Sequence, residues 1–186
     1  MSIINVNEIG PISLGSTVTV TAGSTLKLPT GSKVVGTDAG SVRAPGTVIQ
    51  FAFSRYDPNG DTYTTVAQDT ELVSDVSLTF TPKFASSKLF VITRYHARMI
   101  NANGVAYGIK RDGSNVDGMY QRNSLDFFYK GDQVNHHYTG KCEAYLDANS
   151  TSATTFTIWA SGWSGGTWER SYAFGEHSIA VMEIAQ

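Results

Sequence analysis

The sequence predicts an all-β protein: an antiparallel jelly-roll sandwich over residues 47–186, preceded by an extended N-terminal arm and a short β-repeat stem over residues 1–46. Three observations predict this class. Apolar residues alternate with a period of two along most of the second part. Turn residues such as Asn103-Gly104 and Gly165-Gly166 separate these segments at suitable intervals. An eight-residue repeat precedes them, and almost nothing in the chain has helical periodicity.

Residues 1–14 have the composition of an anchoring arm. Ile3, Ile4, Val6 and Ile9 are separated by Asn, Glu and Gly, so no regular element is predicted. Chain termini usually fray unless something ties them down. We therefore expect this apolar arm to dock on another protein.

Residues 15–46 repeat with a period of eight. The copies read GSTVTVTA, GSTLKLPT, GSKVVGTD and, less clearly, AGSVRAPG. Each copy predicts a short strand followed by a glycine turn. Such a unit is too small to bury its own apolar residues, so it must stack on neighbours or on other chains. Two interpretations stay open, a trimeric fibre stem and a β-meander packed against a host domain.

Longer strands are predicted from Thr47 onward, about eight or nine in all. Ile49, Phe51 and Phe53 share one face, and both faces of residues 88–95 are expected to be partly buried. Asp112-Gly113 predicts a hairpin turn. The remaining strands are predicted at 76–80, 105–109, 138–147, 154–161, 168–174 and 178–184. This succession of short strands is typical of an antiparallel sandwich, most simply a jelly roll.

Composition excludes several function classes. The net charge of -2 comes without a basic stripe, which argues against nucleic-acid binding. No apolar stretch approaches the roughly 20 residues that a membrane helix needs, so we expect no membrane insertion. The N-terminus lacks the features of a secretion signal. We expect synthesis in a host cytoplasm and release only as part of a particle.

Three segments carry a resemblance to a known group of proteins. PTGSKVVGTDAGSVRAPGTVIQ resembles the junction between stem and head in small virion proteins of tailed phages, especially marine ones. SLTFTPKFASSKLFVI and EHSIAVMEIA resemble later strands of the same heads. The likeness spans about residues 28–186, although 100–150 match only in rhythm. It implies a virion structural or tail-fibre-like protein with a trimeric, tumour-necrosis-factor-like jelly-roll head.

No cofactor or metal site is predicted. Residues 57–61, Asp-Pro-Asn-Gly-Asp, match a calcium loop poorly, and a tight turn between strands explains the same residues with no ion. His136 and His137 point to opposite faces of a strand, although symmetry could gather three copies of His137 or of His96 around one zinc ion. Hydrogen-bonded histidines are the simpler expectation. The single cysteine, Cys142, is expected to face the core.

No catalytic set is predicted either. A glycan-cleaving enzyme needs two carboxylates at a defined separation. The spacing in the sequence pairs none of the candidates, which are Asp126, Asp132, Glu143 and Glu169. We therefore expect a non-enzyme.

The candidate receptor contacts are Trp163, Ser164 and Trp168, in and beside a glycine-rich loop predicted at 161–167. Trp159 belongs to the preceding strand, on the face opposite to Phe156 and Ile158. An exposed indole can lie flat on a host surface glycan, but aromatic residues are also enriched where subunits meet. The aromatic run 127–129 raises the same choice.

These inferences combine into two expected roles for a homotrimer in a virion. In the first, the protein is a tail fibre or appendage, whose arm binds the tail and whose head contacts the host surface. In the second, the arm spreads over the capsid as a decoration or cement protein. Both roles need an apolar arm that binds other virion proteins and a trimeric head, so the sequence barely separates them.

Overall fold

The computed structural model describes residues 44–56, 63–67, 71–99, 104–116, 126–129, 136–163, 167–171 and 177–186. The chain divides into two units, Met1–Val35 and Gly36–Gln186, and every described residue lies in the second. The arm, including Ile3, Ile4, Val6 and Ile9, and nearly all of the octads therefore lie outside the described residues.

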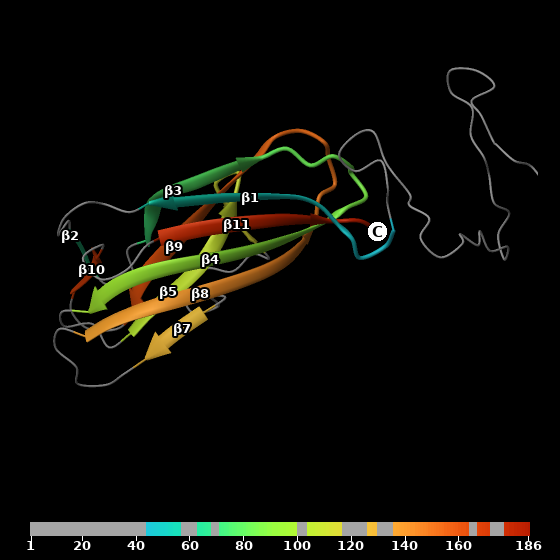
Figure 1. The fold of residues 1–186 in the computed structure, drawn as a ribbon. Helices are drawn as coiled ribbons and strands as arrows, with labels where there is room; N and C mark the ends of the chain where they lie inside the picture. The colour runs from blue at the N-terminus through green and yellow to red at the C-terminus, as the bar shows by residue number, and fades with distance from the viewer. Residues whose placement is uncertain are drawn as a thin grey trace, which may run out of the picture. The chain divides into compact units, whose positions relative to one another are not determined.

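The described part of the chain forms two antiparallel β-sheets (Figure 1). Sheet A has six strands: β1 (Val48–Tyr56), β11 (His177–Ile184), β4 (Lys88–Met99), β8 (His136–Asp147), β10 (Thr167–Ser171) and β2 (Tyr63–Ala67). Sheet B has five: β3 (Glu71–Phe80), β9 (Thr154–Trp163), β5 (Gly104–Arg111), β6 (Ser114–Asn115) and β7 (Asp126–Tyr129). No helix among the described residues is long and apolar enough to cross a membrane.

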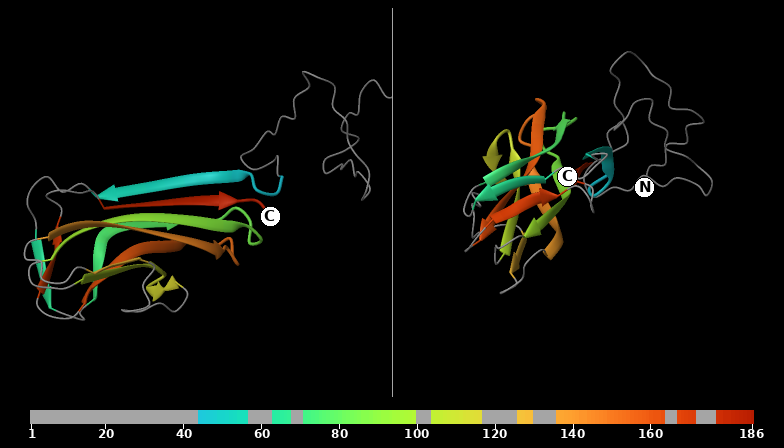
Figure 2. Two further views of the ribbon diagram at one scale, coloured as in Figure 1. Left: turned by 90° about the horizontal axis from the view of Figure 1, so that it is seen from below. Right: turned by 90° about the vertical axis from the view of Figure 1, so that its left-hand side faces the viewer.

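The strand pairing is that of a jelly roll, which confirms the predicted fold class. β1 pairs with β11, β3 with β9, β4 with β8 and β5 with β7. These pairs are nested, as in one long hairpin of eight strands. The hairpin is rolled so that these four pairs alternate between the two sheets, while a fifth nested pair, β2 with β10, adds to sheet A. Segments far apart in the sequence consequently lie side by side, as the blue, red and green strands of sheet A show (Figure 2).

The core lies between the sheets and follows the alternation that the sequence predicts. In β4, Leu89, Val91 and Tyr95 are buried, whereas Phe90 and Ile92 on the other face are half-buried. Both faces of this strand are thus partly covered, as expected. Cys142 faces the core as predicted, with 2% of its surface exposed.

Two aromatic rings pack directly on glycines. A Cβ atom added to Gly108 in β5 would overlap the indole of Trp159, and one added to Gly140 in β8 would lie 2.8 Å from the ring of Tyr107. As the sequence predicts, Trp159 lies on the other face of β9 from the core residues Phe156 and Ile158. Trp159 is nevertheless fully buried. Sheet B is therefore covered on its outer side as well at this position.

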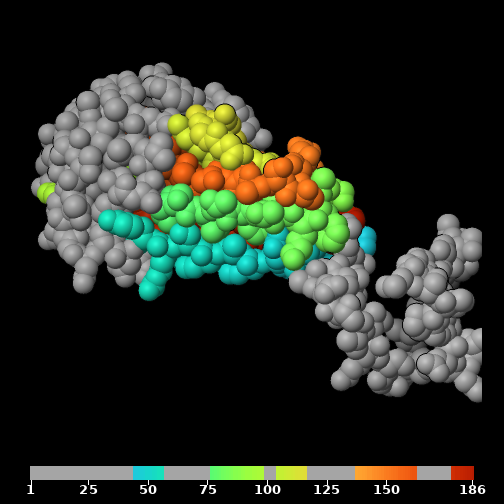
Figure 3. Space-filling model, turned by 90° about the horizontal axis from the view of Figure 1, so that it is seen from above, coloured from blue at the N-terminus to red at the C-terminus, as the bar shows by residue number. Residues whose placement is uncertain are grey.

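The two ends of the sandwich differ in which connections they hold. The C-terminal end holds the turns 81–87, 112–113 and 148–153, and the chain enters there, because the Gly46 amide donates to the Ala185 carbonyl over 2.9 Å. The opposite end holds the ends of β1, β4 and β9, at Tyr56, Met99 and Trp163. In the space-filling view, blue-green β1 residues run along one edge beside green, orange and yellow residues of later strands (Figure 3).

The predicted hairpin turn at Asp112-Gly113 is confirmed. Asp112 and Gly113 have φ angles of 50° and 78° and join β5 to β6. Positive φ at both central residues defines the turn type that Asp-Gly favours between antiparallel strands.

Candidate interaction surfaces

A row of apolar side chains crosses the outer face of sheet A, the face turned away from the core. Phe51 of β1 pairs with Met182 of β11, Met182 pairs with Phe90 of β4, and Phe90 pairs with Tyr145 of β8. Residues directly opposite on neighbouring strands lie on the same face of a sheet. Phe51 is 59% exposed and Tyr145 56% exposed, so a continuous apolar band is open to solvent.

A second row beside this band ends on a charge. It consists of Phe53, Ala180, Ile92 and Glu143, which are cross-strand partners in that order. Phe53 is 52% exposed. Together the two rows form a larger apolar patch on strands β1, β11 and β4. Large exposed apolar patches on a soluble protein mark interaction sites.

A third row, toward the opposite end, is basic. Arg55, Ser178, Arg94 and Lys141 are its cross-strand partners. The Lys141 ammonium forms an ion pair with Glu143 of the second row. On the outer face of sheet A, the two apolar rows thus lie nearer the C-terminal end than the cationic row does.

A hollow of about 400 Å³ lies between the apolar and basic rows. Phe53 and Ile92 border it on one side and Arg94 and Lys141 on the other. Ser178 and Ala180 line it as well, and their small side chains leave the space open. Its other lining residues are Thr93, Thr139 and Gly140.

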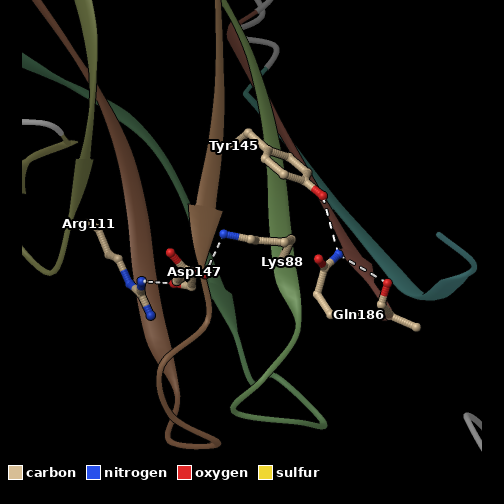
Figure 4. Close-up of polar contacts among 6 residues, drawn as sticks. Lys88, Arg111, Tyr145, Asp147 and Gln186 are labelled. Atoms are coloured by element: carbon tan, nitrogen blue, oxygen red, sulfur yellow. Dashed lines mark hydrogen bonds and ion pairs between the residues drawn. The ribbon is translucent and has the colours of Figure 1, made fainter. Parts of the chain in front are cut away.

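A polar cluster occupies the C-terminal end of the sandwich (Figure 4). Lys88 pairs with Asp147 at 2.5 Å, and its ammonium lies 5.7 Å from the centre of the Tyr145 ring. Arg111 approaches Asp147 from the side opposite to Lys88 and donates to its backbone carbonyl over 2.8 Å. Gln186 donates to the Tyr145 hydroxyl over 3.4 Å. A polar hollow of about 380 Å³ adjoins this cluster, lined by Arg111, Ser114, Asn115, Val116, Tyr145, Leu146, Asp147 and Asn149.

Two histidines face each other on the outer side of β4 and β8. His96 Nε2 lies 3.3 Å from His137 Nδ1, the two rings stack, and His96 Nδ1 lies 2.8 Å from the Thr139 hydroxyl. Burial, the charge of His137 and the charge of Arg94 together lower the pKa of His96 from 6.5 to about 4. Both rings are hydrogen-bonded, the simpler of the two expectations. In the described parts of the chain, no three His, Cys, Asp or Glu side chains gather closely enough to hold a metal ion.

Of the three predicted receptor contacts, the structure describes Trp163 and Trp168 but not Ser164. Trp163 is the last residue of β9 and pairs with Gly104, while Trp168 lies in β10 and pairs with Met99 and Val66. Ser164 lies outside the described residues. The predicted loop 161–167 was too long, because residues 161–163 continue β9 by pairing with β5.

Other predicted sites fall partly within the described ranges. Asp57–Asp61 and Asp132 lie outside them. Among the carboxylates considered for catalysis, Glu143 lies on the outer face of β8, Asp126 in β7 of sheet B and Glu169 in β10 of sheet A.

The surface residues that sequence reasoning missed are Tyr145, Arg94 and Lys141. Their shared row positions depend on the pairing of β4 with β8, two strands that are not neighbours in the sequence. Phe51 and Phe53 did carry a signal, since their spacing predicts a common face, but spacing does not tell which face a sheet buries.

Comparisons with known proteins identify no relative in sequence. No family model matches the chain, and no curated protein matches it. Among solved structures, it is similar to a chain in the structure of infectious bursal disease virus, Gx strain, with a TM-score of 0.43 and 12% identity. The match covers 81% of this chain but 37% of that chain, so this protein spans little more than a third of its length. A similarity this distant identifies no family.

Proposed function

We propose that this protein is a non-catalytic structural component of a tailed-phage virion, a homotrimeric tail-fibre or appendage protein. In this role the N-terminal arm anchors the protein to other virion proteins, and the jelly-roll head meets the host surface. The observation that carries the proposal is the apolar band on the outer face of sheet A, with Phe51 and Tyr145 each more than half exposed. A head of this kind gains stability by association, which covers such a band.

Trimer formation would give that band a partner. Ring-forming contacts join two different surfaces of neighbouring subunits, so the band of one copy need not meet the same band of the next. Light scattering on the purified full chain should report three copies. Replacing both Phe51 and Tyr145 with Ser should shift the protein toward monomer, whereas Lys83→Ser, on an exposed turn, should not. A wild-type monomer would contradict obligate assembly.

The division of the head into two ends supports the appendage role. The chain enters at Ala44–Gly46, at the C-terminal end, and β9 runs from Thr154 near that end to Trp163 at the opposite end. Ten residues of strand span about 30 Å. Trp163 and Trp168 thus occupy the end farthest from the point of entry, where a receptor-binding loop would serve. A host surface glycan is the receptor class we propose.

The alternative role is a capsid decoration or cement protein. It is favoured by the two adjoining rows of apolar residues on sheet A, a broad surface suited to lying against a shell. Labelling the protein on intact virions and locating the label by electron microscopy tests the proposal. Label on the tail supports the appendage, label over the capsid supports decoration, and its absence from the virion contradicts both.

A further inference from the structure

The hollow on the outer face of sheet A has room for a bulky apolar side chain. Phe53 and Ile92 form an apolar wall, and Ala180, which lies between them in the same cross-strand row, is too small to fill the space of about 400 Å³. Every residue that borders the hollow belongs to β1, β11, β4 or β8, so adjacent paired strands hold its shape. A mostly apolar hollow with a few polar groups at its rim is the usual form of a binding site.

The rim facing this apolar wall is cationic. Arg94 and Lys141 border the hollow, and Arg55 stands in the same row of the sheet. Glu143 is the single carboxylate in the adjoining row and lies against Lys141. Within these two described rows, cations therefore outnumber carboxylates, on a chain whose net charge is -2.

We propose that this hollow binds an acidic, apolar peptide segment of another virion protein. A bulky apolar side chain of the segment fills the space between Phe53 and Ile92, and its neighbouring carboxylates face Arg94 and Lys141. Burial of the apolar side chain supplies the affinity. The two cations select for the acidic flanks and set the orientation. The identity of the partner as a virion component rests on the proposed function, but the chemistry of the segment does not.

A second copy of the same face fits this surface less well. Two copies meeting face to face would each bring Arg55, Arg94 and Lys141 against a single Glu143. The contact would then carry excess positive charge, and like charges brought together oppose association. An acidic segment neutralises the same row, so charge complementarity favours it as the occupant.

The test uses the full-length protein and synthetic peptides in isothermal titration calorimetry. The probe is a capped peptide of sequence Gly-Asp-Glu-Leu-Phe-Asp-Glu-Gly. One control peptide carries Asn and Gln in place of the acidic residues, and a second carries Ser in place of Leu and Phe. The probe should bind, and each control peptide should bind at least about tenfold more weakly. Added salt should weaken binding of the probe more than binding of the Asn/Gln control, which lacks the carboxylates.

Two variants test the site from opposite directions. Arg94→Glu reverses a charge at the rim of the hollow and should weaken binding of the probe by about tenfold or more. Ala180→Phe fills the hollow and should abolish binding, with an unchanged unfolding midpoint showing that the fold persists. The matched control is Lys83→Glu, the same reversal on an exposed turn outside the hollow, which should bind like wild type.

Three outcomes would overturn the proposal. The probe fails to bind wild type, Arg94→Glu and Lys83→Glu bind it equally, or Ala180→Phe changes the number of subunits instead of peptide affinity. The third result assigns the hollow to a contact between copies. None of these outcomes bears on whether the protein is present in virions, so failure here is distinct from failure of the proposed function.

Discussion

At the scale of single residues, Glu183 illustrates how a buried charge is tolerated. It lies in β11 on the core side with no exposed surface, and its carboxylate accepts hydrogen bonds from the Gln50 side chain at 2.6 Å and the Phe84 amide at 3.0 Å. The Lys83 amide adds a third donor at 2.9 Å. Hydrogen bonds to an ionised acceptor are about twice as strong as neutral ones. Glu183 therefore ties the turn 81–87 to the last strand.

Glu183→Gln should destabilise the fold, because the new amide group presents two hydrogens to groups that are themselves donors. A buried donor left without an acceptor costs about 1–3 kcal/mol. Urea unfolding at fixed protein concentration measures the loss. Glu143→Gln, on the exposed outer face, is the control and should change the midpoint little. Equal shifts of the unfolding midpoint in the two variants would show that the hydrogen bonds of Glu183 do not stabilise the fold.

His96 makes stability depend on pH. Its pKa in the fold is about 4, below the 6.5 of an unperturbed histidine, because burial and then the charges of His137 and Arg94 disfavour the proton. The unfolded chain therefore binds the proton more tightly than the folded chain. The neutral ring stabilises the fold fully above about pH 6.5, and this contribution is lost as the pH falls toward about 4.

His96→Gln should therefore flatten the acid side of the stability profile. Gln cannot be protonated in this range and can still bond the Thr139 hydroxyl. Unfolding midpoints measured from neutral to acidic pH should fall less for the variant than for wild type. Parallel profiles for the two proteins would contradict a role for His96 titration.

At the scale of elements, the turn between β5 and β6 is hydrogen-bonded to the connection between β8 and β9 at the C-terminal end of the sandwich. The Arg111 guanidinium donates to the carbonyls of Asp147 and Ala148 at 2.8 and 2.7 Å. Asp112 accepts from the Thr154 hydroxyl at 2.6 Å, and this bond, followed by that from the Thr155 amide, lowers the pKa of Asp112. One turn of sheet B thus holds the connection between β8 and β9.

Arg111→Lys should loosen this connection, because an ammonium group cannot reproduce the fork that reaches both carbonyls. We expect a loss of about 1–2 kcal/mol. The amides of Ala148 and Asn149, which donate to Ser87 and Ala85, should exchange their hydrogens faster. Hydrogen exchange followed by mass spectrometry measures this change. Ser114→Ala, in neighbouring β6, should leave exchange unchanged, and protection retained in Arg111→Lys would refute the fastening role.

At the scale of the whole molecule, the two ends of the head carry different features. The chain enters beside Ala185, whereas Trp163 closes β9 at the opposite end. If the head binds a host glycan, Trp163→Ala should cost about 2 kcal/mol or more of binding, since aromatic anchors dominate such contacts. Adsorption assays with virions carrying the change measure it. A trimer that falls apart would instead assign Trp163 to subunit packing, and unchanged adsorption would remove it from the receptor site.

The sequence by itself determined the class of fold and much of its local detail. Alternation predicts the buried residues of β4 and the inward Cys142, because the side chains of a strand point to opposite faces in turn. Asp112-Gly113 predicts its hairpin, because few residue pairs adopt positive φ at both positions. These features depend on neighbours in the chain, so they can be read locally.

The tertiary structure alone decided which residues meet on the surface. Phe51 and Phe53 share a face in any strand, but only the pairing of β1 with β11 turns that face to solvent. Likewise, Arg94 and Lys141 border one hollow because β4 and β8 pair in a single register, and a shift of one residue would send every side chain to the opposite face. Register between strands distant in sequence comes from the packing of the whole sandwich, which no local pattern encodes.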